Sequence, residues 1–237
     1  MEIKFHGHSC FELREGETTV LVDPFLKPNN PCAVATAEEV EPTHIALSHG
    51  HADHVADAVA AAKRTGAHCV AIVELANWLE GQGVEDVSDP NLGGTVGFEW
   101  GWIKLVPAWH TSTAPGSEEA PYSAEHGVSL GTAAGLLIRI GEVTVYHTGD
   151  TCLFGDMKLI AERNPVDVAL LPIGGHYTMD RHDAAVAAEL IGAATTIPMH
   201  YDTFAPIETD SGAFKAEVES KTSSRVVLLK PGETHTA

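Results

Sequence analysis

The sequence predicts an α/β protein in which sheets lie in the middle and helices cover them on the outside. Short apolar segments typical of strands come early, and further strands then alternate with helical segments to the end of the chain. The chain has 237 residues, of which 44% are hydrophobic and 20% charged, a balance typical of globular proteins. A chain of this length can bury its own core, so we expect one domain over residues 1–237. The pattern leaves open whether the strands form one sheet or two.

The N-terminal part begins with three strands that we expect to form a meander. Apolar, β-branched and aromatic residues between turn residues predict these strands at 3–6, 11–13 and 18–22. A Pro/Asn-rich loop at 27–31 leads to a strand at 44–47 and then to a helix at 53–64, in which apolar residues recur with helical spacing. A strand at 69–73 and a helix at 74–79 complete this part.

The remainder of the chain alternates strands and helices. Strands are predicted at 103–108, 136–140, 143–147, 168–172, 195–199 and 226–229. Helices are predicted at 154–163, where Pro165 ends the helix, and at 184–191 and 211–220. We expect loops at the Gly-rich segment 88–97 and at the polar segment 114–127, the latter as a mobile loop near a site.

Charge excludes several kinds of partner. The chain has 33 Asp and Glu against 14 Lys and Arg, a net charge of -19, and no basic run that could follow a nucleic-acid backbone or an anionic membrane. No apolar run approaches the roughly 20 residues that span a bilayer, and the first ten residues do not resemble a secretory signal. We therefore expect a cytoplasmic protein without a nucleic-acid or membrane partner, with a homo-oligomer left open. The four cysteines form no Cys-x-x-Cys pair and are expected to be free thiols.

The segment SHGHADH at residues 48–54 carries the strongest chemical signal. His49, His51, Asp53 and His54 are four potential ligands within six residues, and imidazole and carboxylate groups suit zinc and related divalent ions. The segment follows a predicted strand and opens a helix, so a tight turn can direct its side chains to two points. The alternative is a polar, His-rich turn in which Asp53 caps the helix.

Three more candidate ligands follow later strands in the same way. His110, Asp150 and His200 each come directly after a predicted strand. Because binding groups of α/β proteins gather where strands end, these residues can meet the His/Asp segment at one rim. A lone histidine after a strand is more often structural. The agreement of all three with the His/Asp segment favours the metal site.

The motif HxHxDH, followed in order by His110, Asp150 and His200, resembles the metallo-β-lactamase superfamily. The segments GHSCF at 7–11, VDPF at 22–25, GDT at 149–151, PIGG at 172–175 and PMHY at 198–201 resemble a narrower branch, the poorly characterised metal-dependent hydrolases akin to L-ascorbate-6-phosphate lactonase. The resemblance covers nearly the whole chain. It implies a four-layer αββα sandwich with a metal site at one rim of its two sheets.

The resemblance also implies a ligand set and a reaction. His49, His51 and His110 would bind one divalent ion, Asp53, His54 and His200 a second, and Asp150 both. Zinc is the first expectation, with manganese, nickel or iron as alternatives. The implied enzyme is a binuclear hydrolase that uses a metal-bridged hydroxide on a small ester, lactone or phosphorylated substrate, with Asp53 as the catalytic residue that orients the nucleophile or relays its proton. An iron-dependent oxidoreductase and a non-catalytic metal-binding or regulatory protein are the alternatives.

Four further residues are candidates for supporting roles. His8 and His176 also follow strands, and each is expected either to contact substrate or transfer a proton, or else to be a supporting or surface histidine. His147 lies three residues before Asp150 and is expected to support a ligand. Asp23 is expected either to hydrogen-bond the metal-binding segment or simply to form a turn before Pro24.

Overall fold

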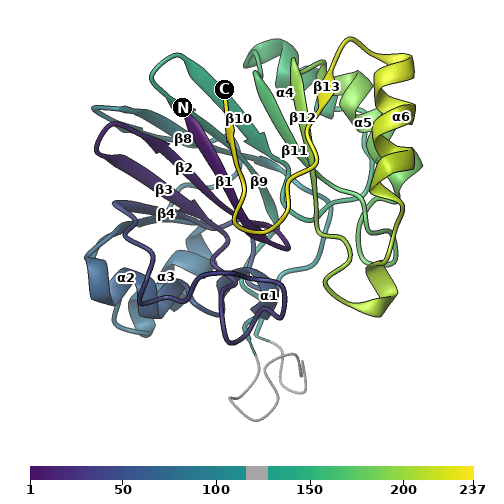
Figure 1. Ribbon diagram of the computed structural model, residues 1–237. Coiled ribbons are helices and arrows are strands. Elements are labelled where there is room, and N and C mark those ends of the chain that lie inside the picture. Colours follow the sequence, from purple (N-terminus) through teal and green to yellow (C-terminus); the bar gives the residue numbers. More distant parts are fainter. Residues whose placement is uncertain (116–127) are drawn as a thin grey trace.

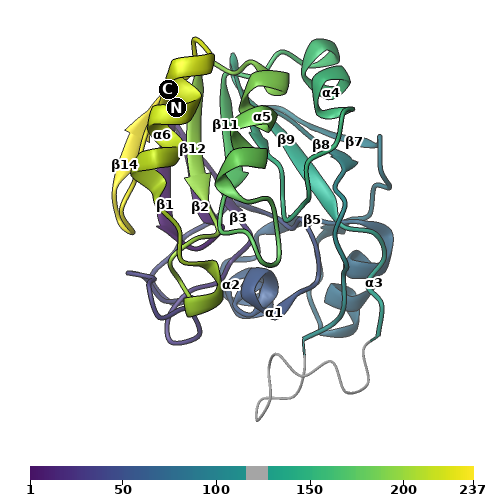
Figure 2. The ribbon, with the colours of Figure 1, turned by 90° about the vertical axis from the view of Figure 1, so that its right-hand side faces the viewer.

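Two sheets of seven strands each face one another in the computed structural model, and helices cover the outer face of each sheet (Figures 1 and 2). The structure describes residues 1–115 and 128–237. The mobile loop expected at 114–127 falls outside the described residues, except for its first two positions. The αββα sandwich implied by the resemblance is confirmed, and it answers the question of one sheet or two.

The first sheet combines an antiparallel meander with parallel strands. Its order is β14 (Thr234–Thr236), β1 (Glu2–Gly7), β2 (Cys10–Glu15), β3 (Thr18–Val22), β4 (His44–Ala46), β5 (His68–Val70) and β6 (Val87–Ser88). The pairs from β14 to β3 are antiparallel and those from β3 to β6 are parallel. The helices of this half are α1 (Ala52–Val55), α2 (Ala58–Thr65) and α3 (Val73–Gly81).

The second sheet repeats this arrangement. Its order is β13 (Arg225–Val226), β12 (Thr195–Met199), β11 (Val168–Pro172), β10 (Val143–His147), β9 (Ala134–Ile140), β8 (Gly101–Pro107) and β7 (Thr95–Phe98). Strands β7 to β10 pair antiparallel and β10 to β13 parallel. The outer face carries α4 (Met157–Arg163), α5 (Arg181–Ile191) and α6 (Ser211–Lys221), and a short 3-10 helix, η1 (Ala205–Ile207), precedes α6.

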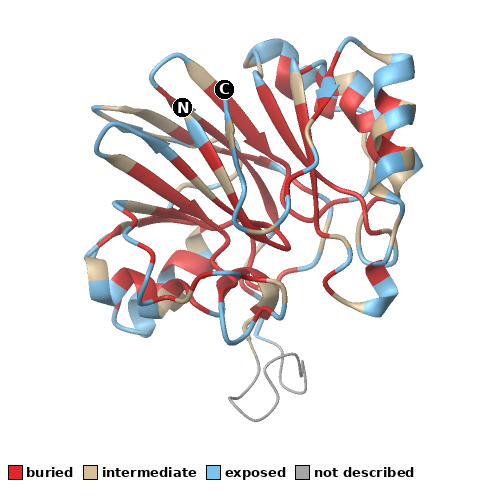
Figure 3. Cartoon of the chain, viewed as in Figure 1, coloured by how far each residue is buried: buried red, intermediate tan, exposed pale blue. Residues whose placement is uncertain are grey.

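Alternating residues of the second sheet face two different cores. Leu136 and Ile138 of β9 belong to the large cluster shared with the first sheet, whereas Leu137 between them packs with the helices outside. Strand β11 does the same, with Leu170 inside and Leu171 outside. This period of two is the property of a strand with both faces covered, and buried residues accordingly run along the strands in Figure 3.

The prediction of a single helix at 53–64 is wrong in one respect, because the structure contains two helices there. The backbone N–H of Asp57 donates to the carbonyl of Pro24 at 3.1 Å, and its carboxylate accepts from the N–H of Leu26 at 2.7 Å. These bonds to a distant loop replace the helical pattern at the junction of α1 and α2. The turn between them fixes the short helix α1, which carries two of the candidate ligands, against the loop that follows β3.

Other element boundaries also differ from the prediction. The Gly-rich segment expected to be a loop at 88–97 contains the start of β7, and the strand expected at 226–229 is reduced to β13. Strands β6 and β14 were not predicted. No helix within the described ranges is long and apolar enough to cross a membrane.

Candidate metal centre

The candidate ligands lie where strands of both sheets end. His49 to His54 follow β4 and enter α1, whereas His110 follows β8, Asp150 follows β10 and His200 follows β12. His8 and Asp23 come directly after β1 and β3. In Figure 1 this end of the sandwich lies beside α1. The strand-end argument therefore places the donors correctly relative to the sheets.

His49, His51 and His110 form a first group. One ring nitrogen of each lies within 4.8 Å of the others. His49 Nε2 and His51 Nδ1 are 3.0 Å apart, and the Ser48 hydroxyl holds His49 Nδ1 at 3.0 Å. His49 is fully buried, whereas the side chain of His110 is 14% exposed.

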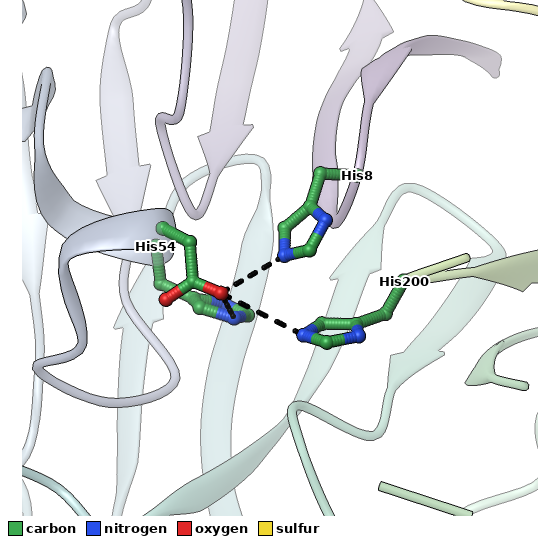
Figure 4. Close-up of side chains that lie close together, drawn as sticks. His8, His54 and His200 are labelled. Carbon is green, nitrogen blue, oxygen red and sulfur yellow. Dashed lines mark hydrogen bonds and ion pairs between the residues drawn. The ribbon is translucent and has the colours of Figure 1, made fainter. Parts of the chain in front are cut away.

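Asp53, His54 and His200 form a second group, and His8 joins it. The ligand atoms of these four residues also lie within 4.8 Å of one another. Asp53 Oδ2 lies 3.1, 3.9 and 3.7 Å from the Nε2 atoms of His8, His54 and His200. Figure 4 shows these three rings around one carboxylate oxygen. The sequence singled out His8 only as a candidate for a supporting or substrate-contacting role.

Asp150 lies between the two groups. Its Oδ2 is 3.0 Å from His200 Nε2 and 3.4 Å from His54 Nε2 in the second group. The same oxygen is 3.7 Å from His110 Nε2 and 4.0 Å from His49 Nε2 in the first. One carboxylate is thus close to both groups, as a bridging ligand requires.

The chemistry of these donors fits divalent cations. Within the described ranges, Asp150 Oδ1 and His54 Nε2 are buried and have no hydrogen-bond partner. A buried polar atom without a partner costs free energy comparable to a lost hydrogen bond. Imidazole nitrogens and carboxylate oxygens that converge in this way are the ligands of zinc and related ions.

Electrostatics separate the two groups. Burial, together with the neighbouring histidines, lowers the pKa of His51 to about 4 and that of His49 well below its usual range, so both rings are neutral at pH 7. In the second group burial also opposes the charged imidazole, but Asp150 and Asp53 outweigh it and raise the pKa of His200 to about 9. Asp150 and Asp23 similarly raise the pKa of His54 well above its usual value. Without metal, protons on His54 and His200 therefore balance the carboxylates, and a divalent ion can replace them.

Asp23 supports the site through three hydrogen bonds. Its carboxylate accepts from the backbone N–H of Ser48 at 2.8 Å, from the Ser48 hydroxyl at 2.5 Å and from His54 Nδ1 at 2.7 Å. It is fully buried, and its φ of 46° lies in the left-handed region. The bond to Nδ1 fixes the His54 tautomer, so that Nε2 presents its lone pair to the second group. Sequence analysis missed Ser48, whose only signal is its place directly before the motif.

His147 supports the turn that carries Asp150. Its buried ring donates from Nε2 to the Ser9 carbonyl at 3.0 Å, and Nδ1 accepts from the N–H of Gly149 at 3.2 Å. Gly149 has a φ of 63°, and a Cβ there would lie 2.5 Å from the carbonyl oxygen of Ala134. Only glycine fits this turn, which delivers Asp150 into the space between the groups.

His176 lies apart from both groups. It is exposed on the loop between β11 and α5, where its ring contacts that of Tyr177. This loop is joined to the site through its backbone, because the N–H of Met179 donates to the carbonyl of Thr151 at 3.1 Å. The structure therefore places His176 on a loop joined to the site and gives it no contact with a candidate ligand among the described residues.

Comparisons with known proteins identify the family of the chain. Residues 2–200 match the β-lactamase superfamily domain. The chain is 45% identical to a UPF0173 metal-dependent hydrolase of Shouchella clausii and 46% identical to one of Methanopyrus kandleri, in each case over 236 residues and 99% of both chains. The solved structure of Igni18, a novel metallo hydrolase from Ignicoccus hospitalis, is 34% identical, with a TM-score of 0.87 over 99% of this chain and 97% of that one. The chain therefore belongs to the metallo-β-lactamase superfamily, among the UPF0173 metal-dependent hydrolases.

Proposed function

We propose that this metal-dependent hydrolase is binuclear and cleaves a small ester, lactone or phosphorylated compound. The observation that carries the proposal is the position of Asp150 Oδ2 within 4.0 Å of histidines from both groups. Each group supplies at least three donors, so two ions can bind side by side with Asp150 between them. Zinc suits this set of imidazole and carboxylate ligands, and manganese, nickel and iron are the alternatives.

The chain's own residues divide the work of the reaction. Bound divalent ions would supply an activated water and an electrophile that stabilises developing negative charge. His49, His54 and Asp150 are buried and would hold the ions, whereas the side chain of Asp53 is 21% exposed and could reach both an ion and solvent. The histidines around Asp53 keep its pKa well below the usual range despite its burial, so the carboxylate is ionised and can orient the attacking water or accept its proton.

Substrate approaches from the more open side of the groups under this proposal. His51, Asp53 and His110 are the ligands with exposed surface, and they define that side. Trp109, next to His110 in sequence, is exposed, and so is Tyr177 on the loop that is hydrogen-bonded to Thr151. The small-molecule partner, the cytoplasmic location and a homo-oligomer stay predictions from the sequence.

Metal analysis tests the binuclear proposal. Protein purified with added zinc or manganese should contain about two ions per chain, and Asp150→Asn should bind both more weakly, since it removes the shared carboxylate. His182→Ala is the matched control, because this exposed histidine pairs with Glu217 on the surface, away from the ligands. A wild-type protein that takes up no metal, or one ion only, would contradict the proposal.

Turnover tests the reaction class. We expect zinc, manganese or nickel forms to hydrolyse at least one of a panel of esters, lactones and phosphodiesters, and His51→Ala to abolish that activity while the fold persists by circular dichroism. Unchanged turnover in His51→Ala would sink the proposed chemistry. Activity with iron and oxygen, but none with zinc or manganese, would assign the protein to the oxidoreductase class instead.

A further inference from the structure

The geometry points to His8 as an additional ligand of the ion in the second group, which gives the two metal positions different coordination. This inference rests on the proposed two-metal function and concerns which side chains bind the second ion. His8 lies outside the motif HxHxDH and outside the three residues His110, Asp150 and His200 that complete the implied ligand set.

The spacing of donor atoms carries the inference. Two ligands about 2.1 Å from one ion are about 3.0 Å apart at a right angle and about 4.2 Å apart when opposite. His8 Nε2 lies 3.1 Å from Asp53 Oδ2, and the ligand atoms of His8, His54 and His200 all lie within 4.8 Å of one another. The pair His49 Nε2 and His51 Nδ1 in the first group shows the same short spacing, 3.0 Å. The His8 ring therefore stands in the relation to Asp53 that two ligands of one ion have.

The second nitrogen of His8 is held as in two other buried ligand histidines, His49 and His54. His49 and His54 each have Nδ1 tied to an oxygen, of Ser48 and Asp23 respectively, and direct Nε2 into the cluster. His8 has Nδ1 2.9 Å from the Thr203 hydroxyl and also directs Nε2 into the cluster.

The Thr203 hydroxyl can itself donate to the carbonyl of Tyr201 at 3.4 Å and accept from Nδ1–H of His8. That arrangement leaves a lone pair on His8 Nε2, facing the Asp53 carboxylate. Without a cation, the other tautomer of His8 can donate from Nε2 to Asp53 Oδ2 at 3.1 Å. A cation between the two groups would replace that hydrogen bond with two metal bonds.

The backbone fixes His8 in this place at a cost. Its φ of 59° lies in the left-handed region, which a residue with a Cβ adopts only under constraint. Its carbonyl accepts from the N–H of His200 at 2.8 Å, and the two rings lie 4.1 Å apart. His8 and His200, from opposite sheets, are thus held as one unit. Strain of this kind concentrates at functional sites, and here it aims a fully enclosed imidazole at the second group.

The consequence is an asymmetric centre. The second ion would have five side-chain donors, from His8, Asp53, His54, Asp150 and His200, whereas the first would have four, from His49, His51, His110 and Asp150. Four ligands suit tetrahedral zinc. Five leave one position of an octahedron open, which suits an ion with a preference for six ligands, such as manganese. The second position should therefore prefer such an ion over zinc.

Cobalt binding tests the inference without any turnover. His51→Ala removes a donor from the first group, so that Co²⁺ fills the second group first, and its visible absorption reports coordination number because four-coordinate Co²⁺ absorbs far more strongly than six-coordinate Co²⁺. In this background, we expect His8→Ala to intensify the absorption per bound ion and to weaken Co²⁺ affinity by more than about 100-fold, beyond what loss of an outer partner causes. His6→Ala is the matched control, because this buried histidine on β1, two residues before His8, contacts Glu12 and no candidate ligand among the described residues.

The outcomes separate this inference from the proposed function. An unchanged spectrum in His8→Ala, whether affinity falls or not, overturns the ligand role and leaves His8 as a hydrogen-bond partner of Asp53. Absence of Co²⁺ binding in the His51→Ala parent overturns the second metal position itself. NMR of wild-type protein labelled with ¹⁵N-histidine and loaded with ¹¹³Cd tests the same inference without substitution at His8. Three histidine nitrogens coupled to each ¹¹³Cd ion support a ligand role for His8, and only two nitrogens coupled to one of the ions overturn it.

Discussion

Asp23→Asn changes one atom of a fully buried carboxylate and tests how the site is oriented. The wild-type oxygens accept three hydrogen bonds, one at Oδ1 from the Ser48 N–H and two at Oδ2 from the Ser48 hydroxyl and His54 Nδ1. Asparagine keeps one acceptor oxygen and presents an NH₂ group in place of the other. In either orientation of the amide, at least one N–H faces the new NH₂ group.

The magnitude follows from the bond that is lost. If the NH₂ group faces Ser48, a buried backbone donor is left without an acceptor, which costs about 1–3 kcal/mol of stability. If it faces His54, the ring must release its Nδ1 proton and carry one on Nε2, which blocks the metal. Loss of a partner that orients a ligand usually lowers metal affinity about 10- to 100-fold. We therefore expect both a less stable protein and a weaker second ion.

Two measurements and one control check this expectation. Urea unfolding in the presence of a chelator reports the stability of the metal-free fold, and competition with a chromophoric chelator reports the affinity of each ion. Asp167→Asn is the control, because that carboxylate accepts from the backbone N–H of Thr144 at 2.8 Å, near the start of β10, and lies outside the ligand groups. It should lose stability and keep its metal affinity. Wild-type affinity in Asp23→Asn would show that the carboxylate does not orient His54, and the reasoning would fail.

Two further predictions use the backbone and the protonation of the site. Gly149→Ala should lose metal from both positions and also lose stability, because its Cβ would clash with Ala134. Gly192→Ala, at a φ of 67° with open space around it, should lose only about 1–2 kcal/mol of stability through backbone strain. Equal effects of the two substitutions, by thermal unfolding and metal analysis, would count against the role of the Gly149 turn. In the metal-free protein the pKa of His200 is raised from 6.5 to about 9, so its contribution to stability is fully present below pH 6.5 and is lost as the pH rises through 9. Urea titrations with chelator at pH 6.5, 8 and 9.5 should show this fall, and His200→Gln should reduce it; a fall of the same size in His200→Gln would contradict the assignment.

The sequence predicted most of the strands, and the exceptions share a physical cause. The meander and the buried parallel strands have enough apolar residues to be recognised locally. Strand β14 consists of three partly exposed residues that depend on β1 for their hydrogen bonds. The break between α1 and α2 likewise depends on the carbonyl of Pro24, more than thirty residues earlier. Features that a distant partner creates leave no local pattern in the sequence.

The candidate site likewise combines features that local sequence predicts with features that distant contacts decide. The residues of the motif are adjacent in sequence, and the strand-end argument brought His110, Asp150 and His200 to them. The same argument gave His8 and His176 equal standing, yet His8 lies inside the second group and His176 is exposed. The chain packs against the backbone of His200 at Gly174, where a Cβ would lie 2.4 Å from that carbonyl oxygen, and then turns outward before His176. Which way a loop leaves its strand is decided by such packing.

Both groups draw donors from both sheets, and this links metal binding to the architecture. In the first group His49 and His51 come from the loop after β4, and His110 comes from the second sheet. In the second group the donors after β1 and β4 meet His200, again from the second sheet. Without ions, the rim joins the sheets through backbone hydrogen bonds, such as that from His200 to His8, and through ion pairs that depend on protonation. An ion that binds only the folded arrangement stabilises it by mass action. Each metal position is therefore expected to act as a cross-link between the two halves of the sandwich, in addition to its part in the reaction.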